Sequence, residues 1–205
     1  MTAIIDGTAG ITTPIDVEIQ GATSGSIIFA APAVAGSNTQ TLVATTGTLA
    51  PIVSSSSVAT TSGTSIDITS IASWAKRITL LFRNVSTSGI SNYQIQLGSS
   101  AGFVTSGYNG VSMRAVATAT GTTADTTGFR LQSLLATATS NGLVTFLTYD
   151  NLIWYGMGSV GDNTNGVLCT FGGAVTLPGV LDRIRITTVN GTDTFDAGTI
   201  SVVLE

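Results

Sequence analysis

Histidine is absent from this chain of 205 residues, and cysteine occurs only once, at Cys169. Without an imidazole there is no Ser-His-Asp triad, no Cys-His dyad and no histidine metal ligand. A single cysteine cannot form an intrachain disulfide or a zinc cluster. These absences exclude the common hydrolase sites, and we predict no catalytic residue, no bound metal and no cofactor.

Charged side chains are scarce as well. They make up 9% of the chain, against about 25% in a typical soluble domain. Seven Lys and Arg residues stand against eleven Asp and Glu residues, which gives a net charge of −4. This balance gives nucleic-acid binding no electrostatic driving force. It also means that few charged groups must be desolvated when copies of the chain pack together.

Long hydrophobic runs are missing, although the mean hydropathy is +0.45. The most apolar window, residues 27–35, contains Pro32 and has about half the length that spans a bilayer. The first residues lack the basic region of a secretory signal. We therefore expect no membrane insertion and synthesis in a reducing compartment.

Short segments in which apolar and polar residues alternate are abundant after residue 64. Alternation with period two predicts strands, and Gly or Asn turns separate the segments. Glycine and β-branched residues interrupt helical periodicity, so the best helical candidate is one short turn at residues 71–75. The sequence predicts an all-β fold, an antiparallel β-sandwich of the jelly-roll type. The expected strands lie at residues 65–71, 77–83, 93–97, 144–149, 152–155, 167–171, 183–189 and 199–204.

Charge placement divides the chain into parts. No charged residue occurs between Glu18 and Asp67. We predict an extended N-terminal arm at residues 1–53, a flexible Ser/Thr-rich linker at 54–63 and the β-sandwich at 64–205. The arm has strand-like pieces at 15–19 and 26–29, but too few large side chains to offset the ordering of its backbone. We expect another chain to order it, because its open strand edges would otherwise invite aggregation.

Two motifs match known catalytic or cofactor-binding signatures. Residues 156–161 read G-x-G-x-x-G, but a dinucleotide site also needs a helix directly after the motif, and the sequence there predicts a turn. Residues 73–76 read S-x-x-K, yet the partner motif K-T-G cannot exist because Lys76 is the only lysine. We interpret both motifs as structural.

Carboxylates offer two weaker candidates for chemistry. Asp193 and Asp196 are close enough in sequence to suggest a glycosidase pair, but both are beside glycines, where Asp commonly forms turns. Oxygen donors for calcium also occur in two clusters that match no EF-hand loop. The clusters are Asp162 with Asn163 and Asn165, and Asn190 with Asp193 and Asp196. Hairpin turns explain the same residues, so turns are the preferred interpretation.

Aromatic and polar residues in three segments are the candidates for receptor contact. Trp154 and Tyr155 are adjacent on an expected strand, so one side chain faces the core and the other faces outward. An aromatic ring outside the core can stack on a sugar or fill a subunit interface. The predicted receptor contacts are Tyr108, Asn109, Trp154, Asp162 and Asn163.

Several segments resemble proteins of tailed-bacteriophage virions. Residues 6–14, DGTAGITTP, resemble the opening of many such proteins. Residues 25–42 and 46–49 are similar to a stretch common in phage tail-fibre-like proteins. The C-terminal part resembles a phage fibre-tip family at residues 73–79, 95–98, 181–187 and 191–198.

The resemblance implies a virion structural protein that trimerises and carries a β-rich outer domain. We predict a non-enzymatic tail fibre or fibre tip on the virion surface, made in the host cytoplasm. As a homotrimer, it would attach to other virion proteins through residues 1–53 and contact host glycan or protein through loops of its outer domain. A capsid decoration protein is one alternative, because the chain has no room for a long shaft. A glycan depolymerase acting through Asp193 and Asp196 is another.

Overall fold

The computed structural model describes residues 17–20, 26–29, 51–132, 135–162 and 164–205. The chain divides into two compact units, Met1–Thr48 and Leu49–Glu205. In the first unit, β1 (Val17–Gln20) pairs antiparallel with β2 (Ser26–Phe29). These strands agree with the expected strand-like pieces, whereas the rest of that unit lies outside the described residues.

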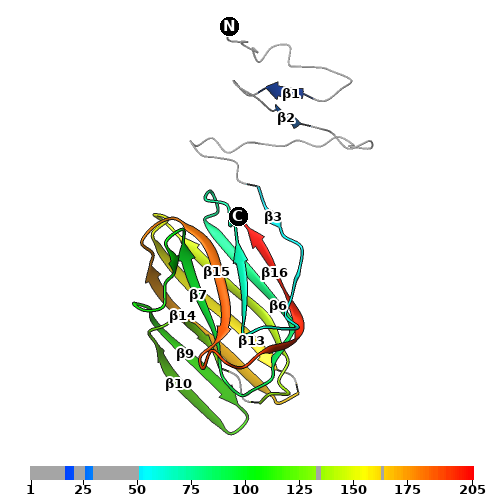
Figure 1. The fold of residues 1–205 in the computed structure, drawn as a ribbon, viewed down its shortest axis with the longest axis vertical. Coiled ribbons are helices and arrows are strands. Elements are labelled where there is room, and N and C mark those ends of the chain that lie inside the picture. The colour runs from blue at the N-terminus through cyan, green and yellow to red at the C-terminus, as the bar shows by residue number, and fades with distance from the viewer. Residues whose placement is uncertain (1–16, 21–25, 30–50, 133–134, 163) are drawn as a thin grey trace. The chain divides into compact units, whose positions relative to one another are not determined.

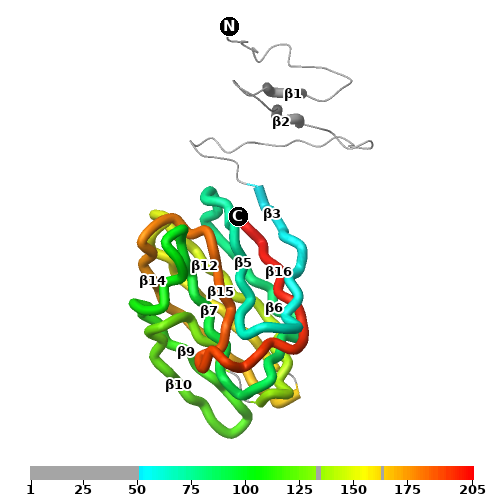
Figure 2. Tube along the Cα trace, viewed as in Figure 1, coloured from blue at the N-terminus to red at the C-terminus, as the bar shows by residue number. Residues whose placement is uncertain are grey.

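The second unit contains two antiparallel sheets, and its described residues include no helix (Figure 1). The large sheet has the order β10 (Ala119–Asp125), β9 (Asn109–Val116), β14 (Val167–Thr176), β13 (Ile153–Asp162), β12 (Ser140–Thr148), β6 (Arg77–Thr87), β16 (Phe195–Leu204) and β3 (Val53–Ser54), with β4 (Val58–Ala59) also paired to β16. The small sheet has the order β11 (Phe129–Leu131), β7 (Tyr93–Ser99), β15 (Leu181–Thr188) and β5 (Ser65–Thr69), with β8 (Gly102–Phe103) paired to β7. Figure 2 follows the chain as it passes repeatedly from one sheet to the other.

One hydrophobic core is shared by the two sheets. It follows from the alternation in the sequence, because every second side chain of strands such as β6 points to the same face. Phe129 of the small sheet is at its centre and is fully buried. Its ring lies 5.4 Å from that of Phe146 and 5.3 Å from that of Phe171, both on the large sheet. The aromatic contacts therefore hold the inner faces of the sheets together.

The structure confirms the predicted all-β, antiparallel class, and each expected strand after residue 64 has a counterpart. The candidate helical turn at residues 71–75 is a hydrogen-bonded turn, in which the backbone N–H of Ala75 donates to the carbonyl of Ala72 at 3.0 Å. Strands β9, β10 and β11 were not expected from the sequence.

The predicted flexible linker at residues 54–63 is corrected by the structure. β3 and β4 pair with β16, and the backbone N–H of Thr60 donates to the carbonyl of Gly198 at 3.0 Å. The Thr60 side chain is fully buried, and its hydroxyl donates to the carbonyl of Ala197 at 2.7 Å. Residues 53–60 therefore form part of the folded domain, because the edge of β16 supplies their hydrogen-bond partners.

The two ends of the large sheet differ in the parts of the chain that they contain. The chain enters the domain at β3, where Val53 is paired with Leu204 near the C-terminus. From this level the strands run to the opposite end of the sheet, where β13 turns into β14 and β9 turns into β10 (Figure 1). We call the end at which the chain enters through β3 the attachment end, and the opposite end the far end.

Thr60→Val tests the correction of the linker. The substitution keeps the shape of the side chain but leaves the carbonyl of Ala197 without its partner. We expect the free energy of unfolding to fall by about 1–2 kcal/mol, measured by denaturant titration of the full chain. Thr61→Val is the matched control, because Thr61 is exposed. Equal stability of the two variants would show that residue 60 is not held against β16.

Candidate functional site

A groove of about 550 Å³ lies at the far end of the large sheet, beside the β13–β14 turn. The groove is shallow and widely open to solvent. Ala115, Leu168, Gly161 and Asn141 form one row across four neighbouring strands. Because Gly161 has no side chain, the row is open between Leu168 and Asn141. The other lining residues are Val116, Asp162, Gly166 and Val167.

Asp162 shapes the turn that borders the groove. Its side chain is buried. One carboxylate oxygen accepts a hydrogen bond from the backbone N–H of Thr164 at 3.0 Å, and the other accepts from the side-chain amide of Asn165. The carboxylate is thus committed to local bonds that fix a tight turn.

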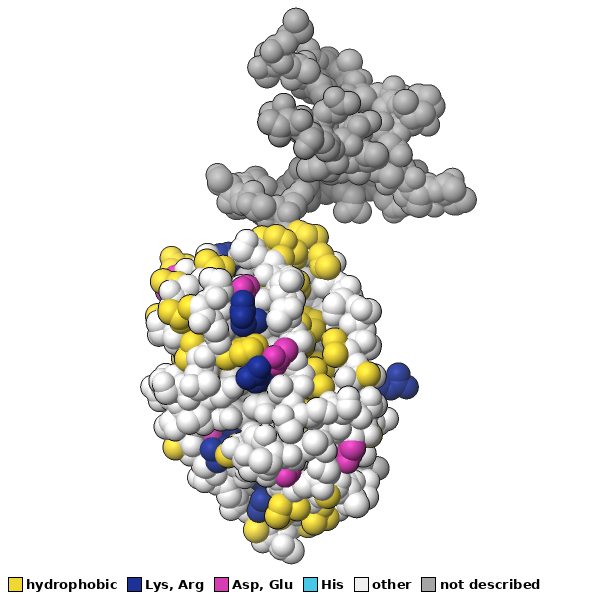
Figure 3. All heavy atoms as spheres, in the orientation of Figure 1, with side chains coloured by type: hydrophobic (Ala, Val, Ile, Leu, Met, Phe, Trp, Pro, Cys, Tyr) yellow, Lys and Arg dark blue, Asp and Glu magenta, His cyan; other side chains and the backbone are white. Residues whose placement is uncertain are grey.

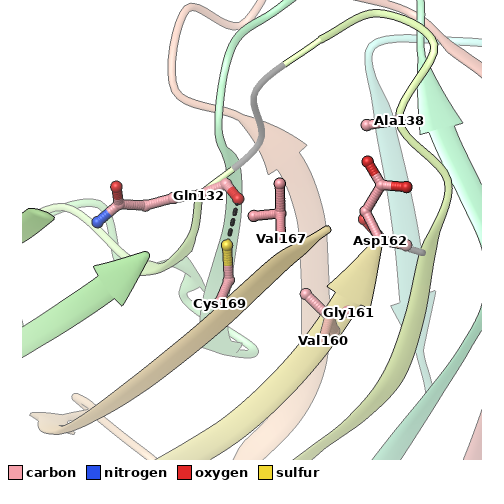
Figure 4. Close-up of a pocket in the computed structure, with 8 residues that line it drawn as sticks. Gln132, Ala138, Val160, Gly161, Asp162, Val167 and Cys169 are labelled. Carbon is pink, nitrogen blue, oxygen red and sulfur yellow. Dashed lines mark hydrogen bonds between the residues drawn. The ribbon is translucent and has the colours of Figure 1, made fainter. Parts of the chain in front are cut away.

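A second, much smaller cavity lies against the same turn and is lined in part by Cys169 (Figure 4). Its volume of about 10 Å³ is close to the lower limit for one water molecule. The Cys169 thiol donates a hydrogen bond to the carbonyl of Gln132. Burial raises the pKa of Cys169 to about 11. The thiol is therefore protonated at neutral pH and is a poor nucleophile.

The groove is suited to binding by shape and apolar contact. Ala115, Val116 and Leu168 supply apolar surface, and Asn141 supplies an amide. The amide oxygen of Asn141 accepts a hydrogen bond from the backbone N–H of Asn84 at 2.9 Å, which leaves its NH₂ group as a donor for a ligand. The lining has a single carboxylate, whereas the usual glycosidase mechanism needs two.

Two of the predicted receptor contacts are core residues, and these predictions are corrected. Trp154 is 2% exposed and Tyr108 is 4% exposed. The Tyr108 hydroxyl accepts from the backbone N–H of Leu97 at 2.8 Å and donates to the carbonyl of Val104 at 3.1 Å. Neither ring can stack on a ligand outside the domain. Of the adjacent aromatic pair, Tyr155 is the outward-facing member and is 55% exposed.

The remaining predicted contacts do not form one site. Asn109 is exposed, but it is paired with Ala174 near the attachment end. Asp162 is paired with Val167 at the far end. The distance from Val167 to Ala174 along β14 is roughly 23 Å at ~3.3 Å per residue. Asn163 lies outside the described residues.

The backbone turns at residues 188–191, and Asp193 lies in the loop that follows. Asp196 is in strand β16, so the preferred interpretation as a turn residue is wrong for Asp196. Asp193 accepts hydrogen bonds from the backbone N–H of Ser91 at 2.9 Å and from the amide of Asn190 at 2.7 Å. Asp196 accepts from the hydroxyl of Ser86. Among the residues that the structure describes, no group of three or more His, Cys, Asp or Glu side chains is placed to hold a metal ion.

The G-x-G-x-x-G residues lie inside strand β13, without a following helix. Their glycines serve packing: a Cβ at Gly156 would come within 2.9 Å of Phe146, and one at Gly158 within 2.6 Å of Val144. In the S-x-x-K motif, Ser73 is in a turn and the Lys76 ammonium donates to the side-chain oxygen of Asn151. Neither motif has the geometry of its catalytic or cofactor-binding counterpart.

Asp125, the most buried carboxylate among the residues whose burial is described, is not among the site residues predicted from the sequence. It is 1% exposed, and burial raises its pKa. It accepts a hydrogen bond from the hydroxyl of Ser112 at 3.1 Å and from the backbone N–H of Arg130 at 3.3 Å, and it also pairs with the Arg130 side chain. Asp125 is in β10 of the large sheet and Arg130 is in β11 of the small sheet, so the contacts between these two residues connect the sheets.

Comparisons with other proteins identify no relative. No protein-family model matches the chain, and neither a curated protein nor a solved structure matches it. Within the part of the chain that is described, no helix is long and apolar enough to cross a membrane.

Gly158→Ala tests the structural interpretation of the glycine motif. The new Cβ would be 2.6 Å from Val144 Cγ2 and 2.9 Å from Val144 Cα, so strands β12 and β13 must shift. We expect a loss of about 1–3 kcal/mol in the free energy of unfolding, measured by denaturant titration. Gly161→Ala is the control, since its Cβ would meet nothing nearer than 3.8 Å. Equal effects of the two substitutions would contradict the packing role.

Cys169 provides a prediction about pH. Its folded-state pKa of about 11 lies above the ordinary value of 9.0. Its contribution to stability is therefore complete below pH 9 and is lost as the pH rises toward 11, by about 2–3 kcal/mol at most. The difference between wild type and Cys169→Ala in alkaline denaturant titrations measures this loss. A difference that does not change between pH 8 and pH 11 would show that the thiol is not buried.

Proposed function

We propose that the chain is a non-enzymatic surface protein of a tailed-bacteriophage virion, a tail fibre or fibre tip that takes part in host attachment. In this proposal residues 1–53 bind other virion proteins, three copies assemble, and the outer domain is a jelly-roll-like β-sandwich. The proposed partners are sister copies, virion proteins and a host glycan or protein, with no role for nucleic acid or membrane insertion.

The observation that carries the proposal is the position of the groove at the end of the large sheet opposite to Val53, where the large sheet begins in sequence. An attachment protein needs this polarity, because one end must face the particle and the other must be free to meet the host. The resemblance of residues 6–14 and 25–42 to phage virion proteins agrees with an anchoring role for the first part of the chain.

The charge pattern supports adhesion through neutral contacts. The described lining of the groove contains no basic residue and one committed carboxylate, Asp162. Amide donors and apolar surface are typical of sites for neutral polar ligands, among them sugars. Three copies raise the effective strength of a weak contact through avidity.

Competition for host cells tests the attachment function. We expect saturating full-length chain, added to host cells first, to block adsorption of the phage that carries it. Gly161→Leu fills the groove and should lower this competing potency about tenfold or more, because three weakened contacts act together. Gly121→Leu is the matched control, since a side chain there meets open space outside the groove lining.

Each other outcome of this experiment contradicts part of the proposal. Equal potency of the two variants would remove the groove from the contact. No competition by the wild-type chain, combined with antibody labelling of the phage head by electron microscopy, would replace host attachment with capsid decoration.

A further inference from the structure

The outer face of the large sheet, which does not contact the small sheet, carries several exposed apolar side chains. Strand pairing arranges it in rows that cross the strands. In the middle row, Met157 lies between Gly172 and Thr145, and Val111 follows Gly172. We call this surface the outer apolar face; its large members are Val111, Met113, Leu143, Leu147, Tyr155 and Met157. They are between 37% and 66% exposed.

The outer apolar face is almost free of charge. The row through Met157 ends at Thr79 and Val203, and the row through Met113 and Leu143 ends at Leu81 and Ser201. Neither row contains a charged residue. Two arginines border the face: Arg77 lies next to Leu147 and is paired with Glu205, and Arg83 is exposed two residues beyond Leu81 on β6. Between these borders, water meets apolar side chains mixed with Thr and Ser hydroxyls, without ionic groups.

The small sheet shows what a solvated face of the same domain looks like. Arg185 is paired with Asp67 at 2.7 Å, and Arg183 with Asp182 at 2.7 Å. Arg185 also lies over the ring of Phe103, at 4.2 Å from its centre. Figure 3 shows basic and acidic side chains next to each other on the face formed by β7 and β15. The two outer faces thus differ in kind, which indicates that the apolar one is covered in the assembled protein.

The size of the outer apolar face suits a subunit contact. Three rows across six strands cover roughly 500 Å² of flat area at a strand spacing of ~4.8 Å. Side-chain relief adds to this area and brings it toward the ~800 Å² per partner of a stable interface. The largest apolar patch of an ordinary monomer is typically about 300–600 Å² and often functional.

We propose that the outer apolar face is the surface through which sister copies of this chain pack against one another. A face without charge can meet its own copy without like-charge repulsion. The face also has both a protrusion and a depression. Met157 is a protruding, flexible side chain with 66% exposure, and beside it Gly172 has open space above it. The protrusion of one copy can therefore enter the depression of the next.

The inference deepens the proposed trimer and rests on it. Its occupant is the same face of the neighbouring copies, enclosed around a common axis. The far-end groove borders this contact, because its row through Leu168 and Gly161 is next to the row of Leu143 and Ser159 on the same face. In this proposal, self-assembly and host contact use neighbouring parts of one sheet.

Cysteine cross-linking of the full chain tests the inference. The native chain has one cysteine, and Cys169 is buried, so an introduced surface cysteine is the reactive thiol. We expect Met157→Cys and Leu143→Cys to give cross-linked dimers with a short bismaleimide. Ile90→Cys is the control, because Ile90 is 70% exposed and lies outside the outer apolar face. Native mass spectrometry of each variant measures the number of copies.

The outcomes separate the inference from the proposal on which it rests. Three-copy particles with cross-links at 157 and 143 but not at 90 support both. A second outcome is a particle of three copies in which the cysteines at 157 and 143 do not cross-link, or in which the cysteine at 90 cross-links equally well. This outcome contradicts the outer apolar face as the subunit contact, but it agrees with the trimer. A mass of 20.7 kDa for the wild-type chain overturns the trimer and the inference together.

Discussion

The contact between the two sheets through Phe129 is the interaction on which the rest of the domain depends. Its ring meets Phe146 and Phe171 of the large sheet, and Tyr108 meets it edge-on at 5.0 Å. The inner faces of both sheets are buried in one core, so the large sheet has one other face, which is directed outward. That outer face carries exposed apolar side chains, which is why we propose that sister copies cover it.

The same constraint is consistent with the two contacts that we propose for this domain. The strands of the large sheet run from the end where the chain enters to the end that holds the groove. In the proposal, the middle of the outer face meets sister copies, and the groove beside the β13–β14 turn meets another ligand. Asp162 holds that turn with local hydrogen bonds from Thr164 and Asn165.

Sequence alone predicted the strands that alternate clearly, such as β6 and β15, because period-two patterns report on burial directly. It failed where the deciding contacts are distant in the sequence. Composition suggested a linker at residues 54–63, but the partner of Thr60 is Ala197, far along the chain. Tyr108 is flanked by Gly and Asn and resembles a loop residue, yet its hydroxyl is satisfied inside the core.

The candidate site was anticipated only at Asp162, since its turn signal is local. The row of Ala115, Leu168, Gly161 and Asn141 comes from four strands whose register no local pattern specifies. A cryo-electron-microscopy reconstruction of an intact particle carrying the protein tests the account most directly. The account predicts three copies with their outer apolar faces enclosed around a common axis and the β13–β14 turns directed away from the particle. Single copies, or turns buried against the particle, would contradict it.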